Sequence, residues 1–238
     1  MAITMAWRLG AALLKPPMSL VLRRNCEGAA HLPVEGVGCI VAGNHVTNID
    51  WLPIAAAFYD IGRPAAILVK DSLFKVPVVG RFLKGLGLIP VQRGTSQAAD
   101  ALNQAEKVLA EGGLVFFFPE GTLTADPDLW PMSPRSGVGR LALRTGAPVL
   151  PLAIWGTNEL MPRSGGFHPI PRKPVRLRLG PAVDLADLTG RVDATAGRQA
   201  TERVMAQVRL LLGQLRGQTP PQQVFDPRHD AQASSAAQ

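Results

Sequence analysis

The sequence predicts an α/β fold, in which a mostly parallel central sheet is flanked by helices and is preceded by an N-terminal apolar helical arm. From Val37 onward, short apolar runs typical of buried strands alternate with longer segments of helical character. Such alternation is typical of parallel strands that are joined by helices. The chain has 238 residues, of which 47% are apolar and 18% are charged, so it can bury a sizeable core.

The first segment, residues 1–24, is predicted to be a helical arm at a membrane interface. Its four basic residues and its lack of acidic ones suit an anionic lipid surface. Pro16 and Pro17 should divide it into two short helices, and no apolar run reaches the ~20 residues that a membrane-spanning helix needs. We expect no signal peptide, because Arg23 and Arg24 stand where the cleavage site would be. An arm packed on the core is the alternative interpretation.

Residues 25–217 are predicted to form the folded domain. Its expected strands are short apolar runs, at residues 39–42, 65–69, 88–92, 114–118, 149–154 and 175–179. Its expected helices are at residues 51–59, 76–86, from Thr95 or Ser96 to Glu111, 137–144 and 201–215. Glycines after the third and fourth of these helices can end them. Residues 218–238, which are rich in Gln, Pro, Ala and Ser, are expected to be disordered.

Charge and composition limit the classes of partner. The net charge is +7, which favours anionic partners such as nucleic acid, an acidic membrane or a phosphorylated substrate. Nucleic acid is excluded as a partner, because aromatic residues are only 5%, with a single Tyr, and no nucleic-acid-binding motif is recognisable. Cys26, Cys39 and four histidines show no zinc-ligand spacing, so no metal site is predicted. Two thiols without a disulfide framework suit the cytoplasm.

A polar cluster at residues 44–50 lies between a predicted strand and a predicted helix. His45 and Asp50 would lie ~140° apart around a regular helix, so they can meet only if His45 occupies the turn and Asp50 the first helical turn. This places an imidazole at the carboxyl end of a strand, where open α/β sheets bind ligands. The carboxylate would fix the tautomer and leave the other nitrogen free as a base. A structural histidine is the alternative.

Two further strand ends carry groups that suit an anion. In the turn at residues 118–122, Gly121 lets backbone N–H groups approach an anion, and Thr122 adds a hydroxyl. Arg93 is placed at the end of the strand at 88–92, where its guanidinium could hold a phosphate through two hydrogen bonds. Taken alone, the first feature is better interpreted as a plain strand-to-loop turn with an exposed Glu, and the second as a solvated arginine.

In this order, the motifs NH-x4-D, IPVQR and FPEGT resemble those of the glycerolipid acyltransferases, specifically the bacterial 1-acyl-glycerol-3-phosphate acyltransferases. The resemblance covers about residues 20–185, and the stretch from Asp126 to Pro148 is similar to an actinobacterial branch. It implies a glycerolipid acyltransferase-like fold, with His45 as the general base and Asp50 as its orienting partner. It also implies a set of residues that hold the glycerol phosphate, namely Lys70, Arg93, Glu120, Gly121 and Thr122.

The chain departs from the family pattern at two positions. Leu123 stands where the family usually has Arg after EGT, which puts one phosphate contact in doubt, and Thr47 replaces a common Ser. Arg135 falls where relatives often carry Lys or Arg. We hypothesise that Arg135 restores the missing charge; an exposed loop arginine is the alternative.

The resemblance implies transfer of an acyl chain from acyl-CoA or acyl carrier protein to the free sn-2 hydroxyl of 1-acyl-glycerol-3-phosphate (lysophosphatidic acid), which forms phosphatidic acid. No metal or bound cofactor is needed, and the partners are lysophosphatidic acid, acyl-CoA and an anionic membrane surface. We therefore expect a peripheral or monotopic protein at the cytoplasmic face of the cell membrane.

Two alternatives to this activity stay open. One is a remodelling acyltransferase for another lysophospholipid or glycerol-phosphate acceptor, which Leu123 favours because a weaker phosphate pocket tolerates a diester. The other is a non-catalytic phospholipid-binding relative. The intact pair of His45 and Asp50 argues against this second alternative.

Overall fold

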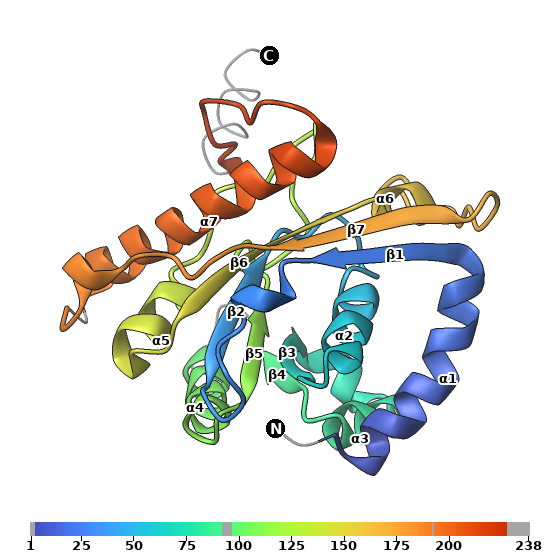
Figure 1. Ribbon diagram of the computed structural model, residues 1–238, viewed down its shortest axis with the longest axis horizontal. Coiled ribbons are helices and arrows are strands. Elements are labelled where there is room, and N and C mark those ends of the chain that lie inside the picture. Colours follow the sequence, from blue (N-terminus) through green and yellow to red (C-terminus); the bar gives the residue numbers. More distant parts are fainter. Residues whose placement is uncertain (1–2, 92–96, 192, 228–238) are drawn as a thin grey trace.

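The computed structural model describes residues 3–91, 97–191 and 193–227, and its centre is a seven-stranded sheet of order β1-β7-β6-β2-β5-β3-β4 (Figure 1). The strands are β1 (Leu22–Glu27), β2 (Cys39–Gly43), β3 (Ala65–Lys70), β4 (Ile89–Val91), β5 (Leu114–Phe117), β6 (Val149–Trp155) and β7 (Lys173–Leu179). Within this described sheet, every neighbouring pair is parallel except β6 with β7. The predicted mostly parallel α/β fold is confirmed.

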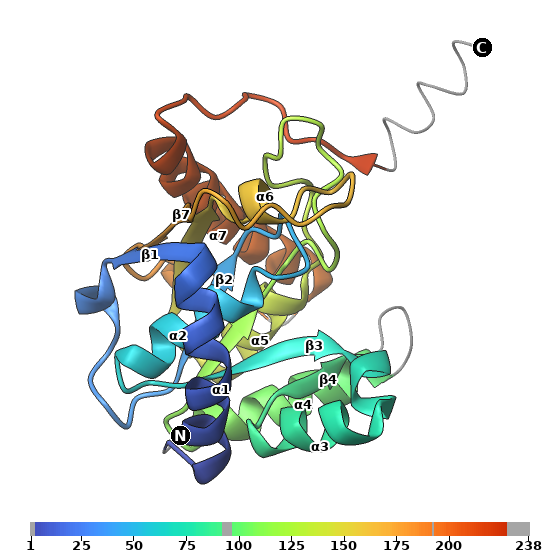
Figure 2. The same ribbon diagram turned by 90° about the vertical axis from the view of Figure 1, so that its right-hand side faces the viewer.

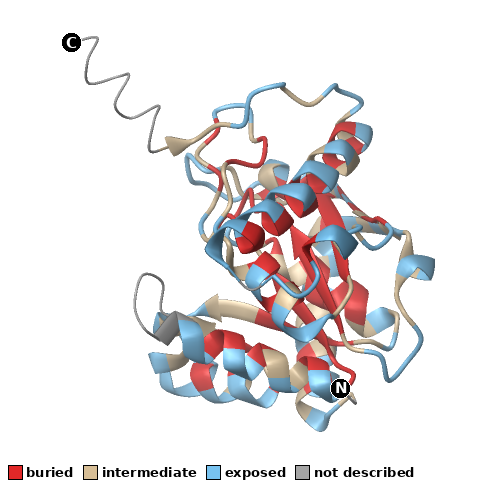
Figure 3. Cartoon of the chain, turned by 90° about the vertical axis from the view of Figure 1, so that its left-hand side faces the viewer, coloured by how far each residue is buried: buried red, intermediate tan, exposed pale blue. Residues whose placement is uncertain are grey.

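Helices cover both faces of the sheet (Figures 1 and 2). They are α1 (Met5–Val21), α2 (Trp51–Asp60), α3 (Pro77–Gly85), α4 (Gln97–Ala110), α5 (Gly137–Thr145), α6 (Thr157–Leu160) and α7 (Ala194–Arg216), with 3-10 turns η1 (Ala29–His31), η2 (Asp71–Lys75) and η3 (Ala186–Leu188). α1, α2 and α3 pack on one face, and α4, α5 and α7 on the other. Along β2, Val41 points to the first layer and Ile40 and Ala42 to the second, so both faces of the strand are apolar. Figure 3 shows the buried stripe of α7 against the sheet and its exposed side facing away.

Most predicted elements agree with the observed ones to within about two residues at their ends, but α7 begins at Ala194, well before the predicted helix at 201–215, and β1 and α6 were not predicted. The predicted helix start at Thr95 or Ser96 lies outside the described residues. β1 pairs with β7 at the edge of the sheet, from Leu22 opposite Lys173 to Glu27 opposite Arg178. Its exposed residues alternate with buried or half-buried ones, and the exposed ones are polar or charged, so it contains no apolar run. The expected domain boundary at residue 24 falls within this strand.

α1 is a single helix, although the sequence predicted two helices divided by Pro16 and Pro17. Both prolines are exposed, and so are Ala12 and Leu13, whose carbonyl groups lose their donors within the helix. Water can bond these carbonyl groups, and the helix therefore continues. The other side of α1 packs on the core through Trp7, which is 4% exposed. Among the described residues, no helix is both long and apolar enough to cross a bilayer.

Part of the C-terminal segment that the sequence predicted to be disordered is packed against the domain. In residues 218–227, the carbonyl group of Phe225 accepts a hydrogen bond of 2.8 Å from the Ser133 N–H. The segment therefore covers the loop that carries Ser133. Residues 228–238 lie outside the described residues.

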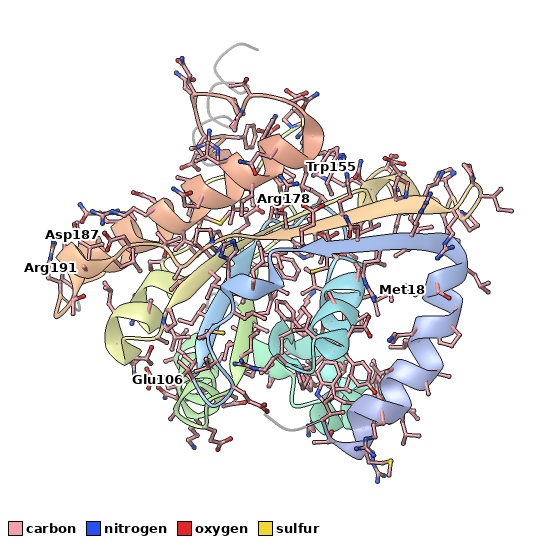
Figure 4. All side chains as sticks on the ribbon, viewed as in Figure 1. Met18, Glu106, Trp155, Arg178, Asp187 and Arg191 are labelled. Atoms are coloured by element: carbon pink, nitrogen blue, oxygen red, sulfur yellow. The ribbon has the colours of Figure 1, made fainter. Side chains whose placement is uncertain are left out.

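Two arginines, one on β7 and one on α7, join α7 to other parts of the domain. Arg178 on β7 donates to the side chain of Gln214 on α7 at 3.0 Å, and Figure 4 shows Arg178 between the sheet and this helix. Arg216, at the end of α7, lies 4.2 Å from the ring centroid of Trp130 and 4.4 Å from that of Trp155. The loop that carries Trp130 is thereby held to both α7 and β6.

The polar motifs meet at one edge of the sheet, because β2, β3, β5 and β6 are parallel neighbours. Their last residues, Gly43, Lys70, Phe117 and Trp155, define what we call the carboxyl edge. β1 and β7 run in the opposite direction and therefore begin at this edge. Open α/β sheets bind their ligands at such an edge.

Candidate active site

The 44–50 loop leaves β2 at the carboxyl edge and is tied to the strands on both sides of β2. On the β6 side, the Asn44 side chain accepts from the Ile154 N–H at 2.9 Å and donates to the Ile154 carbonyl at 3.0 Å. On the β5 side, the His45 carbonyl accepts from the Thr124 N–H at 2.8 Å. Asn44 is fully buried, and these bonds fix the backbone that carries His45.

His45 and Asp50 meet in the way that their spacing required. His45 lies in the turn after β2, and Asp50 occupies the N-cap position of α2. The atoms His45 Nδ1 and Asp50 Oδ2 are 2.9 Å apart. Because a carboxylate accepts the hydrogen bond, Nδ1 carries the proton, and Nε2 keeps its lone pair. No described residue hydrogen-bonds to Nε2, so this nitrogen is free to act as a base.

Asp50 is completely buried, and the hydrogen bonds to its carboxylate offset the loss of hydration. Oδ2 accepts from the His45 ring and from the backbone N–H groups of Val46 and Thr47, at 2.9, 2.7 and 2.9 Å. Oδ1 accepts from the hydroxyl groups of Thr47 and Thr157, at 2.9 and 2.5 Å. These donors fix the plane of the carboxylate and therefore the direction in which it holds His45.

An aromatic stacking contact also holds the His45 ring. It stacks on the Phe118 ring with 3.9 Å between the ring centroids and 19° between the planes. The His45 side chain is 11% exposed, so a reacting group can reach the imidazole only through a small opening. The stack and the Asp50 contact together leave the ring one orientation.

Glu120 was predicted to hold the substrate, but its side chain is 2% exposed and binds the backbone of the protein itself. Oε1 accepts from the His45 N–H at 2.9 Å, and Oε2 accepts from the Met132 N–H at 3.0 Å. Burial raises the pKa of Glu120 to about 8, against the opposite effect of these two donors. With both oxygens engaged, Glu120 positions His45 and the loop of Met132 rather than a ligand.

Arg135 lies directly over the glycine of the FPEGT turn. Gly121 has a φ of +72°, which favours glycine, and a Cβ there would lie 2.9 Å from Arg135 Cδ and Nε, so the Arg135 side chain passes close to this residue. The Arg135 N–H also donates to the Pro119 carbonyl at 2.9 Å. The structure therefore brings the charge of Arg135 to the turn that precedes Leu123. Thr122, which stands between Gly121 and Leu123 in the chain, is exposed.

A hollow of about 760 Å³ opens beside this turn. Its charged and hydroxyl-bearing lining residues come from the turn, from α7 and from the chain on either side: Glu120, Thr122, Ser133, Arg135, Ser136, Arg198, Glu202 and Asp226. The lining is therefore mixed in charge. The volume suits a polar group larger than a single phosphate.

The other two predicted phosphate ligands are not joined to this cluster by described contacts. Lys70 ends β3 at the carboxyl edge with an exposed side chain. Within the described residues, no hydrogen bond or ion pair links Lys70 to His45 or Arg135. Arg93 lies outside the described residues.

The sequence analysis did not single out three residues of the site. Asn44 belongs to the first motif and directly precedes His45, and this position in the sequence could have indicated it as a residue of the site. Thr157 follows β6 and lies 107 positions after Asp50, so only its place after a strand end could have indicated it. Arg198 lies on α7 within a stretch to which the sequence analysis assigned no element, and nothing in the sequence pattern linked it to the site.

Comparison with known proteins places these residues in a family context. The sequence profile of the family described as Acyltransferase matches residues 23–155. The chain is similar to the chloroplastic 1-acyl-sn-glycerol-3-phosphate acyltransferase BAT2 of Brassica napus, with 29% identity over 141 residues that cover 59% of this chain and 39% of that protein. It is similar to the 1-acyl-sn-glycerol-3-phosphate acyltransferase of Borreliella burgdorferi, with 33% identity over 133 residues that cover 56% and 51%. The chain thus spans between 39% and 51% of the length of these two relatives.

Among solved structures, the chain resembles the crystal structure of PlsC, the 1-acyl-sn-glycerophosphate (LPA) acyltransferase from Thermotoga maritima. The TM-score is 0.61 and the sequence identity is 26%, and the match covers 86% of this chain and 78% of the other. The predicted fold family is therefore confirmed, and the similarity extends well beyond the residues that the family profile matches.

The role of Glu120 can be tested with the Glu120→Gln variant. A carboxyl oxygen can accept a hydrogen bond even when it carries the proton, whereas an amide nitrogen cannot, so one of the two backbone N–H groups loses its partner and the free energy of unfolding should fall by about 1–3 kcal/mol. The loss should depend on pH. Between the ordinary pKa of 4.5 and the folded-state pKa of about 8, the folded protein keeps a proton that the unfolded chain releases, so the contribution of Glu120 to stability falls as pH rises.

Urea unfolding of the wild type and of Glu120→Gln across this pH range measures both effects. The destabilisation should be largest at the acidic end and should shrink toward the alkaline end. Glu202→Gln is the matched control, because Glu202 is exposed on α7, and it should change neither quantity. A pH-independent difference would contradict the raised pKa, and equal stability would contradict the backbone role.

The hydroxyl group of Thr157 should stabilise the folded protein through Asp50. Thr157→Val keeps the shape of the side chain but removes one donor to a buried carboxylate, and it should cost about 1.5–3 kcal/mol in the free energy of unfolding. Thr157→Ser keeps the donor and should recover most of this loss. The measurement is urea unfolding at neutral pH. A valine variant as stable as the wild type would show that this hydrogen bond does not stabilise the fold.

Proposed function

The chain belongs to the acyltransferase family, and on that premise we propose that it transfers an acyl chain from acyl-CoA or acyl carrier protein to the free sn-2 hydroxyl of 1-acyl-glycerol-3-phosphate. The product is phosphatidic acid. The observation that carries this proposal is the contact between His45 and Asp50 at the carboxyl edge, because it supplies an oriented base. The names of the relatives support the choice of acceptor.

In the proposed reaction, Nε2 of His45 removes the proton of the acceptor hydroxyl while the hydroxyl oxygen attacks the thioester carbonyl. A C–O bond forms, the C–S bond of the tetrahedral intermediate breaks, and the imidazolium returns the proton to the leaving thiolate. The Asp50 carboxylate stabilises the imidazolium and keeps the ring in place. The acyl chain passes directly between the substrates, so both must be held in one complex, and positioning supplies much of the rate.

The phosphate of the acceptor needs cations near this base. We assign it to Lys70 and Arg93, as the family resemblance implies, and add Arg135 in place of the arginine that Leu123 replaces. The position of Arg135 against Gly121 supports this assignment, because it puts a guanidinium at the FPEGT turn.

A second acceptor class is favoured by the hollow beside the turn. Its volume of about 760 Å³ and its mixed lining suit a lysophospholipid whose phosphate is a diester with a polar headgroup. Leu123 stands in place of an arginine that the family usually carries, and the loss of this charge weakens the preference for a doubly charged phosphate monoester. It therefore also favours an acceptor whose phosphate is a diester. A remodelling acyltransferase is therefore the second candidate function.

We also place the protein at the cytoplasmic face of the cell membrane, as a peripheral or monotopic protein. The substrates carry acyl chains that reside in the bilayer. α1 exposes a row of large apolar side chains, at Met5, Leu9, Leu13 and Leu20, and these can enter the interface while Trp7 holds the helix to the core.

The proposed activity is tested by incubating the purified protein with palmitoyl-CoA and a panel of lysophospholipids, and by following the release of free thiol. His45→Ala should lower the rate by about 10²–10⁴-fold, because the base is lost. His31→Ala is the matched control, since His31 is exposed beyond the end of β1, and β1 runs away from the carboxyl edge. Equal rates in His45→Ala and the wild type would remove this mechanism.

The acceptor assignment is tested with Arg135→Ala. Loss of one charge-assisted hydrogen bond should raise the KM for lysophosphatidic acid by about one to two orders of magnitude. The KM for palmitoyl-CoA should change little. Arg140→Ala, one turn further along α5 and also exposed, is the control and should leave both constants unchanged. If Arg135→Ala leaves the acceptor kinetics unaltered, Arg135 does not compensate for Leu123.

A further inference from the structure

Large apolar side chains that remain exposed are concentrated on two segments of the described chain. One is the row on α1. The other lies between the end of β3 and the first turn of α3, where four residues are exposed: Leu73, Val76, Val78 and Val79. We call residues 73–79 the 73–79 ridge. Val78 is 81% exposed, which is more than any apolar residue on α1.

The ridge is not explained by the packing of the domain. α3 already buries Leu83 in the core, and the Phe82 ring lies against Gly10 of α1. Val78 and Val79 of the first turn are exposed instead, and so is Pro77. Exposing several adjacent apolar side chains is unfavourable in water, and such a patch is typical of a contact surface.

The charge around the ridge indicates which kind of surface it contacts. Between Asp71 and Asp100 the sequence has no acidic residue. Arg81 and Lys84 on α3 are exposed and form no ion pair with any described residue, whereas Lys75 pairs with Asp71 at 3.0 Å. Apolar side chains flanked by unpaired cations suit the interface of an anionic bilayer.

The place of the ridge in the fold fits the same partner. It follows Lys70 at the carboxyl edge, which is the edge that carries His45. α3 packs against α1, and Figure 2 shows both helices on the side of the molecule that faces the viewer. The two exposed apolar segments therefore lie on neighbouring helices.

We propose that the 73–79 ridge inserts into the same anionic bilayer as α1, as a second point of attachment. One helix lying on a membrane leaves the protein free to rotate about its axis. A second contact on a neighbouring helix removes this freedom and turns the carboxyl edge toward the lipid. This inference rests on the proposed function for the nature of the substrate, but membrane binding is measured without any turnover.

The test uses the full chain and vesicles of phosphatidylcholine with phosphatidylglycerol in a flotation assay. Val78→Asp should lower the partition coefficient by about ten-fold or more, because a charge replaces an inserted apolar side chain. Val34→Asp is the matched control: Val34 is 76% exposed but lies in the loop before β2, and its substitution should leave flotation unchanged. Deletion of α1 is unsuitable, because Trp7 belongs to the core.

A milder pair of variants guards against misfolding. Val78→Thr nearly preserves the shape of the side chain, and Lys84→Gln removes one cation; each should weaken flotation, the second only with vesicles that contain phosphatidylglycerol. Thiol release with the acceptor in detergent micelles should stay at the wild-type rate in both variants.

Unchanged flotation of Val78→Asp and Val78→Thr would overturn the proposal and would assign the ridge to a protein partner. Equal losses in Val78→Asp and Val34→Asp would overturn it as well. A wild type that floats with vesicles but transfers no acyl chain would refute the proposed function and leave this inference standing.

Discussion

Two buried carboxyl groups, those of Asp50 and Glu120, hold the loop that carries His45, and the remaining geometry of the site depends on them. Asp50 binds the loop from within, through Val46, Thr47 and the His45 ring. Glu120 binds it from the β5 side, through the His45 N–H. A buried carboxylate is tolerated only when donors replace the lost water, so the loop and the carboxylates stabilise each other. A shift of the loop would take hydrogen-bond donors away from both buried carboxyl groups, and this cost holds the base in place.

The layered fold could be predicted from the sequence because its central strands are buried on both faces. Such strands appear as continuous apolar runs, and β2, β5 and β6 were found in this way. β1 could not, because an edge strand needs apolar residues on one face only, and Arg23 and Arg24 interrupt the pattern. α1 was divided wrongly at Pro16, since the penalty for a proline depends on whether water reaches the freed carbonyl group, which the sequence does not reveal.

The candidate site was predictable to the extent that its residues are neighbours in the chain. His45 and Asp50 meet within one loop. Their spacing alone predicted that they can be in contact only if His45 lies in the turn and Asp50 at the start of the helix. Thr157 comes from the end of β6, so its hydrogen bond to Asp50 depends on the order of strands in the sheet. Glu120 was recognised through its motif, but its hydrogen bonds to the backbone were not foreseen, because the motif does not tell whether the side chain points into the protein or out of it. Burial decides between these roles, and burial is a property of the whole fold.

The pairing of β1 with β7 also determines the order in which the protein can be completed. Leu22 lies opposite Lys173, so about 150 residues must leave the ribosome after β1 before its partner strand exists. A contact between such distant segments closes a long loop and forms late, after the central sheet has supplied the compensating contacts. During this interval α1 is already synthesised but its strand is unpaired. The exposed apolar side chains of α1 are thus present on the nascent chain long before the sheet has closed.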